Sequence, residues 1–277
     1  GNMYWHPWLV MLNEQRRMAP AISEFPSKFI YNRLLKDNAE VINGKKKRDN
    51  DLVIKSAPLP GDALNLIDLA GTYCAADKNT DGSRFNILSA VISFSTAVKA
   101  EQNHIETVGI ITPYAAQVRL IRAMLKDYYT KGTTNVSCAT VHQFQGSESD
   151  VIVFDAVESY PKSAVGYLMG KEPNQVARLI NVAITRGKGK VITVANARFW
   201  ENVFKGTNHI FYKLLQHIKN GKHHVIDNHD KTLQPYIESV NPGRMINIFM
   251  NEQDAISMFE QDMKKAICWY ERAAEQN

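Results

Sequence analysis

Arg186 stands where a rigid element could present it to a phosphate group. It ends the run 181–186, which has the pattern of the last turns of a helix, and a Gly-rich break at 187–190 and an apolar strand at 191–194 follow. A guanidinium is planar, always charged and rich in donors, so it suits phosphate oxygens. A helix-capping arginine would look the same. The residue alone leaves both interpretations open.

The composition is that of an ordinary globular protein. Hydrophobic residues make up 44% of the 277 positions and charged residues 22%, which is enough apolar material for a core. We expect one large domain, or one domain with an extension. The net charge of +5 favours anionic partners only mildly.

Targeting and redox signals are weak. The apolar runs are strand-sized, so we expect no membrane partner, and the N-terminus lacks a basic segment with an apolar core. Cys74, Cys138 and Cys268 show no paired spacing, which favours a reducing compartment without a zinc site or disulfides. We therefore expect a cytoplasmic location and no metal ligands.

Apolar strands alternate with segments of helical spacing along the chain. Strands are expected at 8–12, 64–70, 108–111, 136–141, 151–154 and 191–195, and helices from 21, at 86–101, from 114 through 125, and at 175–186. This order predicts an α/β fold in three layers, with a mostly parallel sheet covered by helices on both faces. A ligand site then lies beyond the carboxyl ends of the strands.

Three polar regions interrupt this order. Residues 37–62 and 72–83 have loop composition, and the basic run 45–48 is interpreted as a solvated loop because Asp49 and Asp51 offset its charge. After 206 the pattern changes. We expect a domain at 1–206 and a small, mainly helical C-terminal extension at 207–277, with a last helix at 254–274. Histidines at 223, 224 and 229 fit a surface cluster better than a metal site, since no cysteine or carboxylate set accompanies them.

Four polar clusters flank the expected strands. They comprise Leu12, Gln15, Arg17, Met18, Pro20 and Ile22; Ile111, Thr112, Pro113, Tyr114 and Gln117; Val141, Phe144, Gln145, Gly146, Glu148 and Asp150; and Asn181, Val182, Ala183, Thr185 and Arg186. As an ordered set over about residues 9–205, they resemble the C-terminal RecA-like lobe of superfamily 1 helicases, in the branch related to the nonsense-mediated-decay helicase.

The resemblance implies a site that this chain shares with another lobe. It implies Arg17 and Arg186 as catalytic arginine fingers that stabilise charge during phosphoryl transfer. Residues implied to bind the cofactor, ATP with Mg²⁺, are Gln15, Arg16, Gln145, Gly146 and Glu148. Residues implied to face single-stranded DNA or RNA are Thr112, Pro113, Tyr114, Thr140 and His142. For Tyr114, a helix-start residue packed in the core is the open alternative.

The sequence departs from the family pattern at two positions. Arg16 replaces the aromatic residue that stacks on adenine, which puts base preference in doubt, and Ala19 replaces a histidine. A phosphate-binding loop of the form G-x-x-x-x-G-K-[ST] is also absent from the sequence. The strand 151–155 with Glu158 resembles a magnesium-binding strand. Because it directly follows the Gln-Gly-x-Glu cluster, it is better interpreted as a core strand.

These features predict the second motor lobe of an ATP-dependent helicase, inactive without an upstream RecA-like lobe. Whether the chain alone counts as an enzyme stays open. The alternative is a stand-alone nucleic-acid-binding or scaffold module that keeps the fold without the ATPase role. An unrelated dinucleotide-binding domain would need a Gly-rich turn after the first strand, and residues 12–20 contain no glycine.

Overall fold

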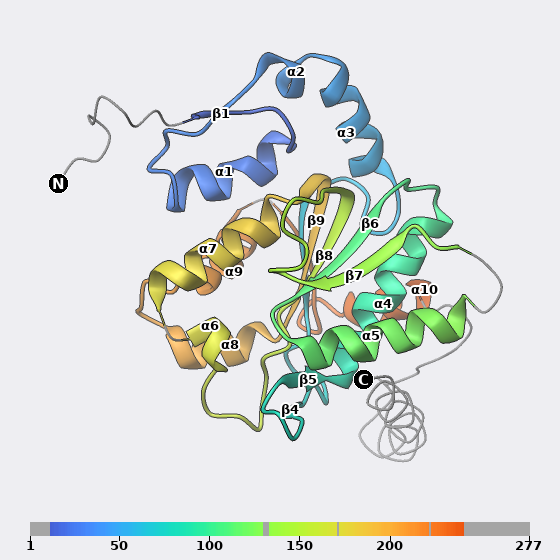
Figure 1. Cartoon of the computed structure of the whole chain (residues 1–277), viewed down its shortest axis with the longest axis vertical. Coiled ribbons are helices and arrows are strands. Elements are labelled where there is room, and N and C mark those ends of the chain that lie inside the picture. The colour runs from blue at the N-terminus through green and yellow to red at the C-terminus, as the bar shows by residue number, and fades with distance from the viewer. Residues whose placement is uncertain (1–11, 130–132, 171, 222, 241–277) are drawn as a thin grey trace.

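A central sheet of six parallel strands organises the chain (Figure 1). In this computed structural model the described residues are 12–129, 133–170, 172–221 and 223–240. The strands run in the spatial order β10 (His224–Ile226), β3 (Leu64–Asp68), β9 (Gly187–Ala195), β8 (Ser149–Asp155), β6 (Val108–Thr112) and β7 (Val136–Thr140). The predicted α/β class with a parallel sheet is confirmed. The expected helix at 254–274, and all but Leu12 of the expected strand at 8–12, lie outside the described residues.

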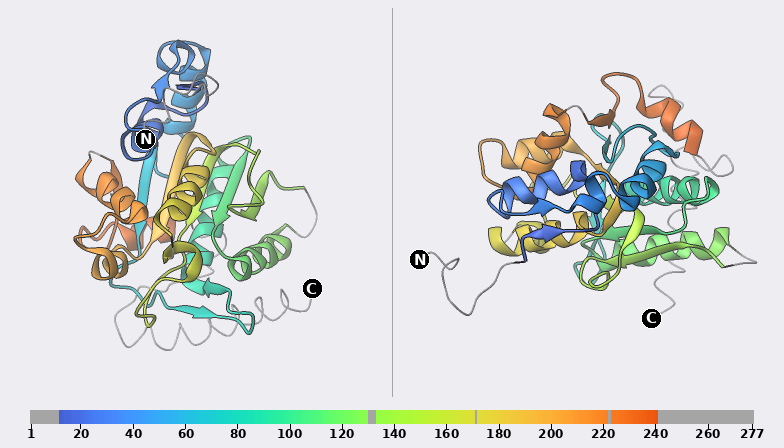
Figure 2. Two further views of the ribbon diagram at one scale, coloured as in Figure 1. Left: turned by 60° about the vertical axis from the view of Figure 1, so that its left-hand side comes forward. Right: turned by 90° about the horizontal axis from the view of Figure 1, so that it is seen from above.

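Helices cover both faces of this sheet, as predicted. One face carries α4 (Ile87–Gln102), α5 (Ala115–Tyr128) and α10 (Leu233–Val240), and the other carries α6 (Tyr167–Gly170), α7 (Pro173–Ile184), α8 (Ala197–Phe204) and α9 (Ile210–Asn220) (Figures 1 and 2).

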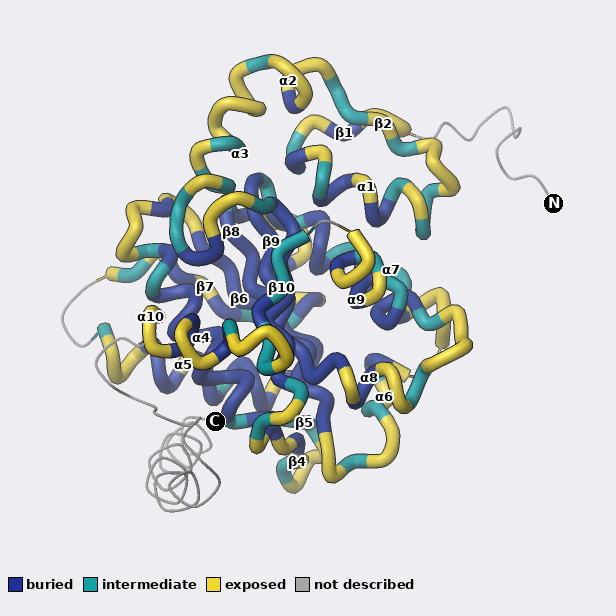
Figure 3. The backbone as a smooth tube through the Cα atoms, turned by 180° about the vertical axis from the view of Figure 1, so that it is seen from behind, coloured by how far each residue is buried: buried dark blue, intermediate teal, exposed yellow. Residues whose placement is uncertain are grey.

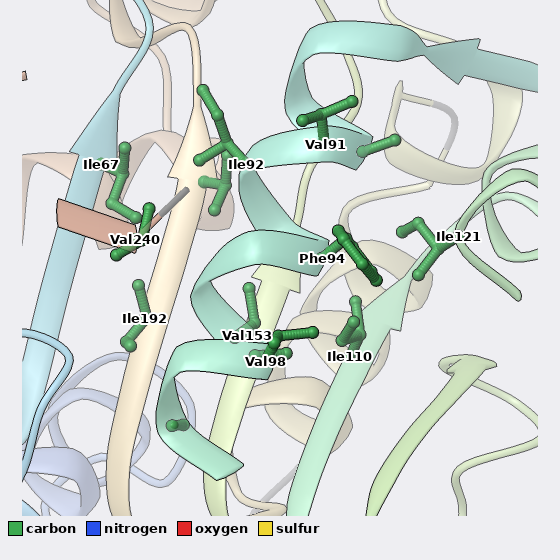
Figure 4. Packing of buried hydrophobic residues seen from close by; sticks show 14 of the residues in the cluster. Ile67, Val91, Ile92, Phe94, Val98, Ile110, Ile121, Val153, Ile192 and Val240 are labelled. Atoms are coloured by element: carbon green, nitrogen blue, oxygen red, sulfur yellow. The ribbon is translucent and has the colours of Figure 1, made fainter. Parts of the chain in front are cut away.

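The side chains of each strand point alternately to the two faces of the sheet and so contribute to the hydrophobic core on each face. In β8, Val151 and Val153 belong to the cluster under α4 and α5, whereas Ile152 and Phe154 belong to the cluster under α7 and α9. Figure 4 shows Val153 beneath α4 with Val98 and Ile110. Because successive side chains of a strand point to opposite faces, a strand buried on both sides is apolar throughout.

Local signals set several helix boundaries. Pro20 and Pro173 occupy the first turns of α1 (Pro20–Phe29) and α7, where their missing N–H groups cost nothing. The Asn86 side chain accepts a hydrogen bond from the Ser89 amide and caps α4. The expected helices at these positions are confirmed to within a few residues.

A small N-terminal module, residues 12–56, lies beyond the amino ends of the strands (Figures 1 and 2). It contains β1 (Glu14–Gln15) paired with β2 (Lys36–Asp37), then α1, α2 (Ala39–Ile42) and α3 (Lys45–Lys55). Figure 3 shows that much of its outer surface is exposed.

The expected loop at 37–62 is therefore wrong over much of its length. The basic run 45–48 is the first turn of α3, in which Lys47 pairs with Asp51 one turn later at 2.5 Å. Long unbranched side chains favour a helix, and α3 packs on β9.

The expected Gly-rich break at 187–190 is also wrong, because β9 already begins at Gly187. A Cβ added at Gly189 would lie 2.6 Å from the Cβ of Val53, so glycine permits the close approach of α3. Lys190 is fully buried, and its Nζ donates to the carbonyls of Ser56 at 2.5 Å and Pro58 at 2.8 Å. Lysine fits a strand here because another segment supplies its acceptors.

The polar region 72–83, expected as a loop, contains a strand of an antiparallel hairpin. Strand β4 (Ala76–Lys78) pairs with β5 (Arg84–Asn86) around a turn at Gly82. The hairpin lies at the carboxyl ends of the large sheet's strands, opposite the N-terminal module (Figure 1).

The described residues after 206 share the main core. Helix α9 buries Phe211, Leu214 and Ile218 in the cluster with α7, and β10 pairs in parallel with β3. The described part of the expected extension is therefore integral to the sheet. No helix among the described residues is long and apolar enough to cross a membrane.

Candidate functional site

Arg17 and Arg186 converge with Glu148 at the start of β8 and β9. Arg17 Nε lies 2.5 Å from Glu148 Oε2, and its Nη1 donates to the Thr185 carbonyl at 3.0 Å. Arg186 donates from Nε to the Val182 carbonyl at 3.2 Å and from Nη1 to the Ser147 carbonyl at 3.3 Å. The bond to Val182 caps the last turn of α7, so the capping role is present. Arg186 also lies close enough to Arg17 for the charge of Arg17 to act on it.

The electrostatics of this arginine pair (Arg17 and Arg186) favour an anion. Burial, followed by the nearby charge of Arg17, lowers the pKa of Arg186 below its ordinary value, and Glu148 partly offsets this. Glu148 thus pairs directly with Arg17, and its charge also acts on Arg186. A guanidinium is planar and rich in donors, which suits phosphate oxygens.

The loop that carries Arg17 is held by its own glutamine. Gln15 is buried, and its Oε1 accepts the amides of Arg17 at 2.9 Å and Met18 at 2.8 Å. Its Nε2 donates to the Met18 carbonyl at 3.0 Å and to Asp37 Oδ1 at 2.5 Å. The carboxamide expected to bind the cofactor is therefore occupied within its own loop.

Arg16, the other expected cofactor ligand of this loop, faces solvent. Its side chain is 70% exposed and pairs with Glu14 at 3.2 Å. Its backbone carbonyl accepts a hydrogen bond from Lys46 Nζ at 2.7 Å, and Asn50 Nδ2 donates to the Arg17 carbonyl at 3.4 Å. Helix α3 thus holds the backbone of the arginine-bearing loop.

The arginine pair lies at the amino edge of the sheet, not at the carboxyl edge where we expected the ligand site. Glu148 precedes β8 and Arg186 precedes β9, and the N-terminal module covers the same edge (Figure 1). A cavity of about 550 Å³, the amino-edge cavity, opens there. Its charged lining consists of Arg17, Lys45, Lys46, Lys188, Asp49, Glu106, Glu148 and Asp150. The expectation that every polar cluster lies at a carboxyl end is wrong for these residues, because they lie in the connections that enter β8 and β9, whereas Thr112 does end β6.

The segment 141–148 links the two edges. It leaves β7 at the carboxyl edge and returns to enter β8 at the amino edge. Gly146 has φ +95°, a conformation that favours glycine, and an added Cβ would meet nothing within 4 Å. The glycine is therefore required by backbone conformation.

A second cavity, the α7 cavity, lies between this segment and α7. Its volume is about 430 Å³. Its lining consists of Val141, His142, Gln145, Leu168, Gln175, Arg178, Leu179, Asn181 and Val182. Gln145, expected at the cofactor, and His142, expected at the nucleic acid, thus share one cavity.

The expected nucleic-acid residues divide into buried and accessible members. Thr112 and Pro113 are buried, and Tyr114 is 5% exposed in the core, where its hydroxyl donates to Glu158. The alternative interpretation of Tyr114, a helix-start residue in the core, matches this position, and its ring cannot stack on a base in this conformation. Thr140, which is half-buried, and His142, which is exposed, remain accessible.

Asp155 and Glu158 serve the interior. Asp155 accepts from Gln117 Nε2 at 2.7 Å and from the Val157 amide at 3.0 Å, and burial raises its pKa to about 6. Glu158 pairs with Arg84 and accepts the Gly166 amide at 2.8 Å. Their oxygens are committed to core hydrogen bonds, in line with the core interpretation of this strand. The described residues contain no group of three or more His, Cys, Asp or Glu side chains that could hold a metal ion.

Sequence reasoning missed the side chains that support the site. Lys46 and Asn50 lie on a helix where the sequence predicts a loop, and Lys188, which pairs with Asp150 at 2.6 Å, lies in a strand where the sequence predicts a break. The one available signal was the i,i+4 spacing of Lys47 and Asp51, which favours a helix.

Known proteins resemble this chain over most of its length. A family described as "AAA domain" matches residues 5–198. The chain is 30% identical over 217 residues to the DNA polymerase alpha-associated DNA helicase A of Schizosaccharomyces pombe, covering 75% of this chain and 30% of that protein. It is 32% identical over 199 residues to the protein of the same description from Saccharomyces cerevisiae, covering 67% and 27%.

A third relative carries another name. The Regulator of nonsense transcripts 1 homolog of Drosophila melanogaster is 30% identical over 200 residues, covering 68% of this chain and 15% of that protein. The chain spans less than a third of the length of each of these three relatives.

Proposed function

We propose that this chain, which belongs to the AAA-domain family, forms the second motor lobe of an ATP-dependent helicase. The family includes superfamily 1 helicases related to the nonsense-mediated-decay helicase. The observation that carries the proposal is that Arg17, paired with Glu148, and Arg186 lie near one another at the amino edge of the sheet. On this proposal, the first lobe supplies the phosphate-binding loop that this sequence lacks.

The donor set of the site fits a nucleoside triphosphate. ATP, when bound, supplies the phosphoryl group that is transferred to water. The arginine pair then neutralises charge that develops on the phosphate oxygens, and such a residue contributes roughly 10³–10⁵ in rate. Glu148 holds Arg17 in place before the nucleotide arrives, and Gln15 fixes the loop that bears it.

At the amino-edge cavity Glu148 pairs with Arg17 and Asp150 with Lys188, and the strand that resembles a magnesium-binding strand serves the core. The carboxylates of Asp155 and Glu158 are buried and hydrogen-bonded within the core. We therefore assign the magnesium ion that accompanies ATP to residues of the first lobe and to the nucleotide, and we assign to this lobe the positioning of positive charge.

Nucleic acid is assigned to the other end of the 141–148 segment. The accessible residues of the expected set there are Thr140, the last residue of β7, and His142. A hydroxyl and an imidazole suit phosphate and base contacts of a single strand. Because one segment carries both His142 and Glu148, the strand and the nucleotide contact the same short stretch of chain.

Complementation with a first lobe tests the proposal. The chain alone is expected to hydrolyse no ATP, and adding a family lobe that carries the phosphate-binding loop is expected to produce hydrolysis stimulated by single strands. Arg186→Ala and Arg17→Ala should each lower kcat by about 10³-fold or more. Arg198→Ala, at an exposed arginine of α8, is the matched control and should leave kcat unchanged.

Two results would count against the assignment. ATP hydrolysis by the chain alone, abolished by Arg186→Ala, would refute the dependence on a first lobe. Restored hydrolysis that is indifferent to both arginines would refute their role and favour a scaffold module that keeps the fold.

A further inference from the structure

The α7 cavity differs in chemistry from the amino-edge cavity. Three carboxamides line it, those of Gln145, Gln175 and Asn181. Arg178 adds one positive charge, and none of the described residues that line it carries a carboxylate. The amino-edge cavity, by contrast, mixes cations with four carboxylates.

These groups match the edge and the face of a planar heterocycle. A carboxamide offers both donors and an acceptor, as the hydrogen-bonding edge of a nucleobase requires. Apolar side chains, including Val141 and Leu179, supply surface against which a ring can pack. The absence of carboxylates among the described lining residues leaves nothing there to repel a phosphate.

One amide oxygen in this cavity has no protein partner. Asn181 donates from Nδ2 to the Tyr31 hydroxyl at 2.8 Å, which fixes its orientation, while its buried Oδ1 accepts no hydrogen bond within the described residues. A buried acceptor without a partner is costly. The oxygen is buried, so a donor from a ligand reaches it only if the carboxamide turns toward the cavity.

We propose that the α7 cavity binds one unpaired nucleobase through its carboxamides, with Arg178 facing the attached phosphate. The inference rests on the proposed function insofar as the base belongs to a single strand. A free nucleotide offers the same chemistry, so the experiment separates the two sources.

The α7 cavity lies beside the two segments whose carbonyls accept hydrogen bonds from Arg186. Val182 lines the cavity and its carbonyl accepts from Arg186, while Gln145 lies two residues before Ser147, whose carbonyl accepts from the same guanidinium. Both walls of the cavity therefore hold Arg186. A base in the cavity contacts the segments that orient this arginine.

Binding of labelled single strands with and without bases tests the inference. Anisotropy is measured at one fixed salt concentration for a short fluorescein-labelled strand and for a strand of equal length and charge made of abasic residues. The chain should prefer the base-bearing strand by roughly tenfold, which corresponds to about 1.4 kcal/mol. Gln175→Leu should remove this preference and leave affinity for the abasic strand unchanged.

A matched control lies on the same segment. Gln143 is exposed and is not among the residues that line the cavity, so Gln143→Leu should keep the preference. Competition with adenosine and uridine monophosphates forms the second arm. Competition that depends on Gln175, in a chain that binds neither strand, would support a free nucleotide as the source and would count against the proposed strand track.

Three kinds of outcome overturn the base pocket. Equal affinity for the two strands would show that bases are not bound, while leaving nucleic-acid binding by the lobe intact. A preference that survives Gln175→Leu, or is lost equally in Gln143→Leu, would place the bases elsewhere. Binding of neither strand nor nucleotide would refute the pocket and the strand track together.

Discussion

The stability of this fold should rise with pH between about 8 and 10.5 because of Lys190. Burial lowers the pKa of this lysine from 10.5 to about 8, and its ammonium contacts two backbone carbonyls and, within the described residues, no carboxylate. In the unfolded chain the lysine keeps its proton up to about pH 10.4. The unfolded state therefore binds more protons over this range, and stability increases as the pH rises.

The magnitude follows from the difference between the two pKa values. A shift from 10.5 to about 8 corresponds to a charge-burial cost on the order of 3 kcal/mol below pH 8, at about 1.4 kcal/mol per pKa unit. Between pH 7.5 and pH 10, roughly 2 kcal/mol of this cost should disappear.

Urea unfolding followed by tryptophan fluorescence measures the effect as a difference between two proteins. Other buried groups titrate in the same range. The pKa of Tyr236 and that of Cys138 are raised by burial, which opposes the lysine effect. Lys190→Met retains these groups, so the stability of the parent chain minus that of the variant isolates Lys190. A difference that stays constant from pH 7.5 to pH 10 would refute the reasoning.

Two further substitutions test the packing around the site. Gly189→Ala should destabilise the fold by about 1–3 kcal/mol, because its Cβ would lie 2.6 Å from that of Val53, and adding Val53→Ala should recover part of the loss in a double-mutant cycle read by thermal unfolding. Tyr114→Phe should cost about 1–3 kcal/mol in urea unfolding, because buried Glu158 loses a donor, yet should leave strand affinity unchanged. Loss of strand affinity without loss of stability would instead assign Tyr114 to the nucleic-acid surface.

Apolar periodicity predicted the strands and helices of the main sheet well. Both faces of runs such as 151–154 and 108–111 are buried, and an uninterrupted run without charged residues in the sequence indicates this burial directly. Helix α3 was missed because its surface is charged, and its place depends on Val53 meeting Gly189 far along the chain. The start of β9 was missed for a similar reason, since Lys190 resembles a loop residue until carbonyls of another segment satisfy it.

The candidate site was predicted in composition and only partly in position. The motif resemblance grouped Arg17, Glu148 and Arg186, and the structure brings these three residues together. It did not show that they lie at the amino edge of the sheet, nor that Gln15 is bonded within its own loop. Motif spacing gives the order of residues, whereas edge and burial depend on strand direction and on packing of distant segments.

The pairing of β10 with β3 bears on how the chain acquires its structure. Strand β10 follows β3 only after the other four strands of the sheet, so this edge is completed only once the segment between β3 and β10 has been synthesised. Until then β3 presents unpaired backbone groups along one side of a largely apolar strand, the kind of edge that recruits other chains. A polypeptide ended at residue 206 would keep that edge and lose α9. We expect it to aggregate, so cooperative folding requires the residues beyond 206.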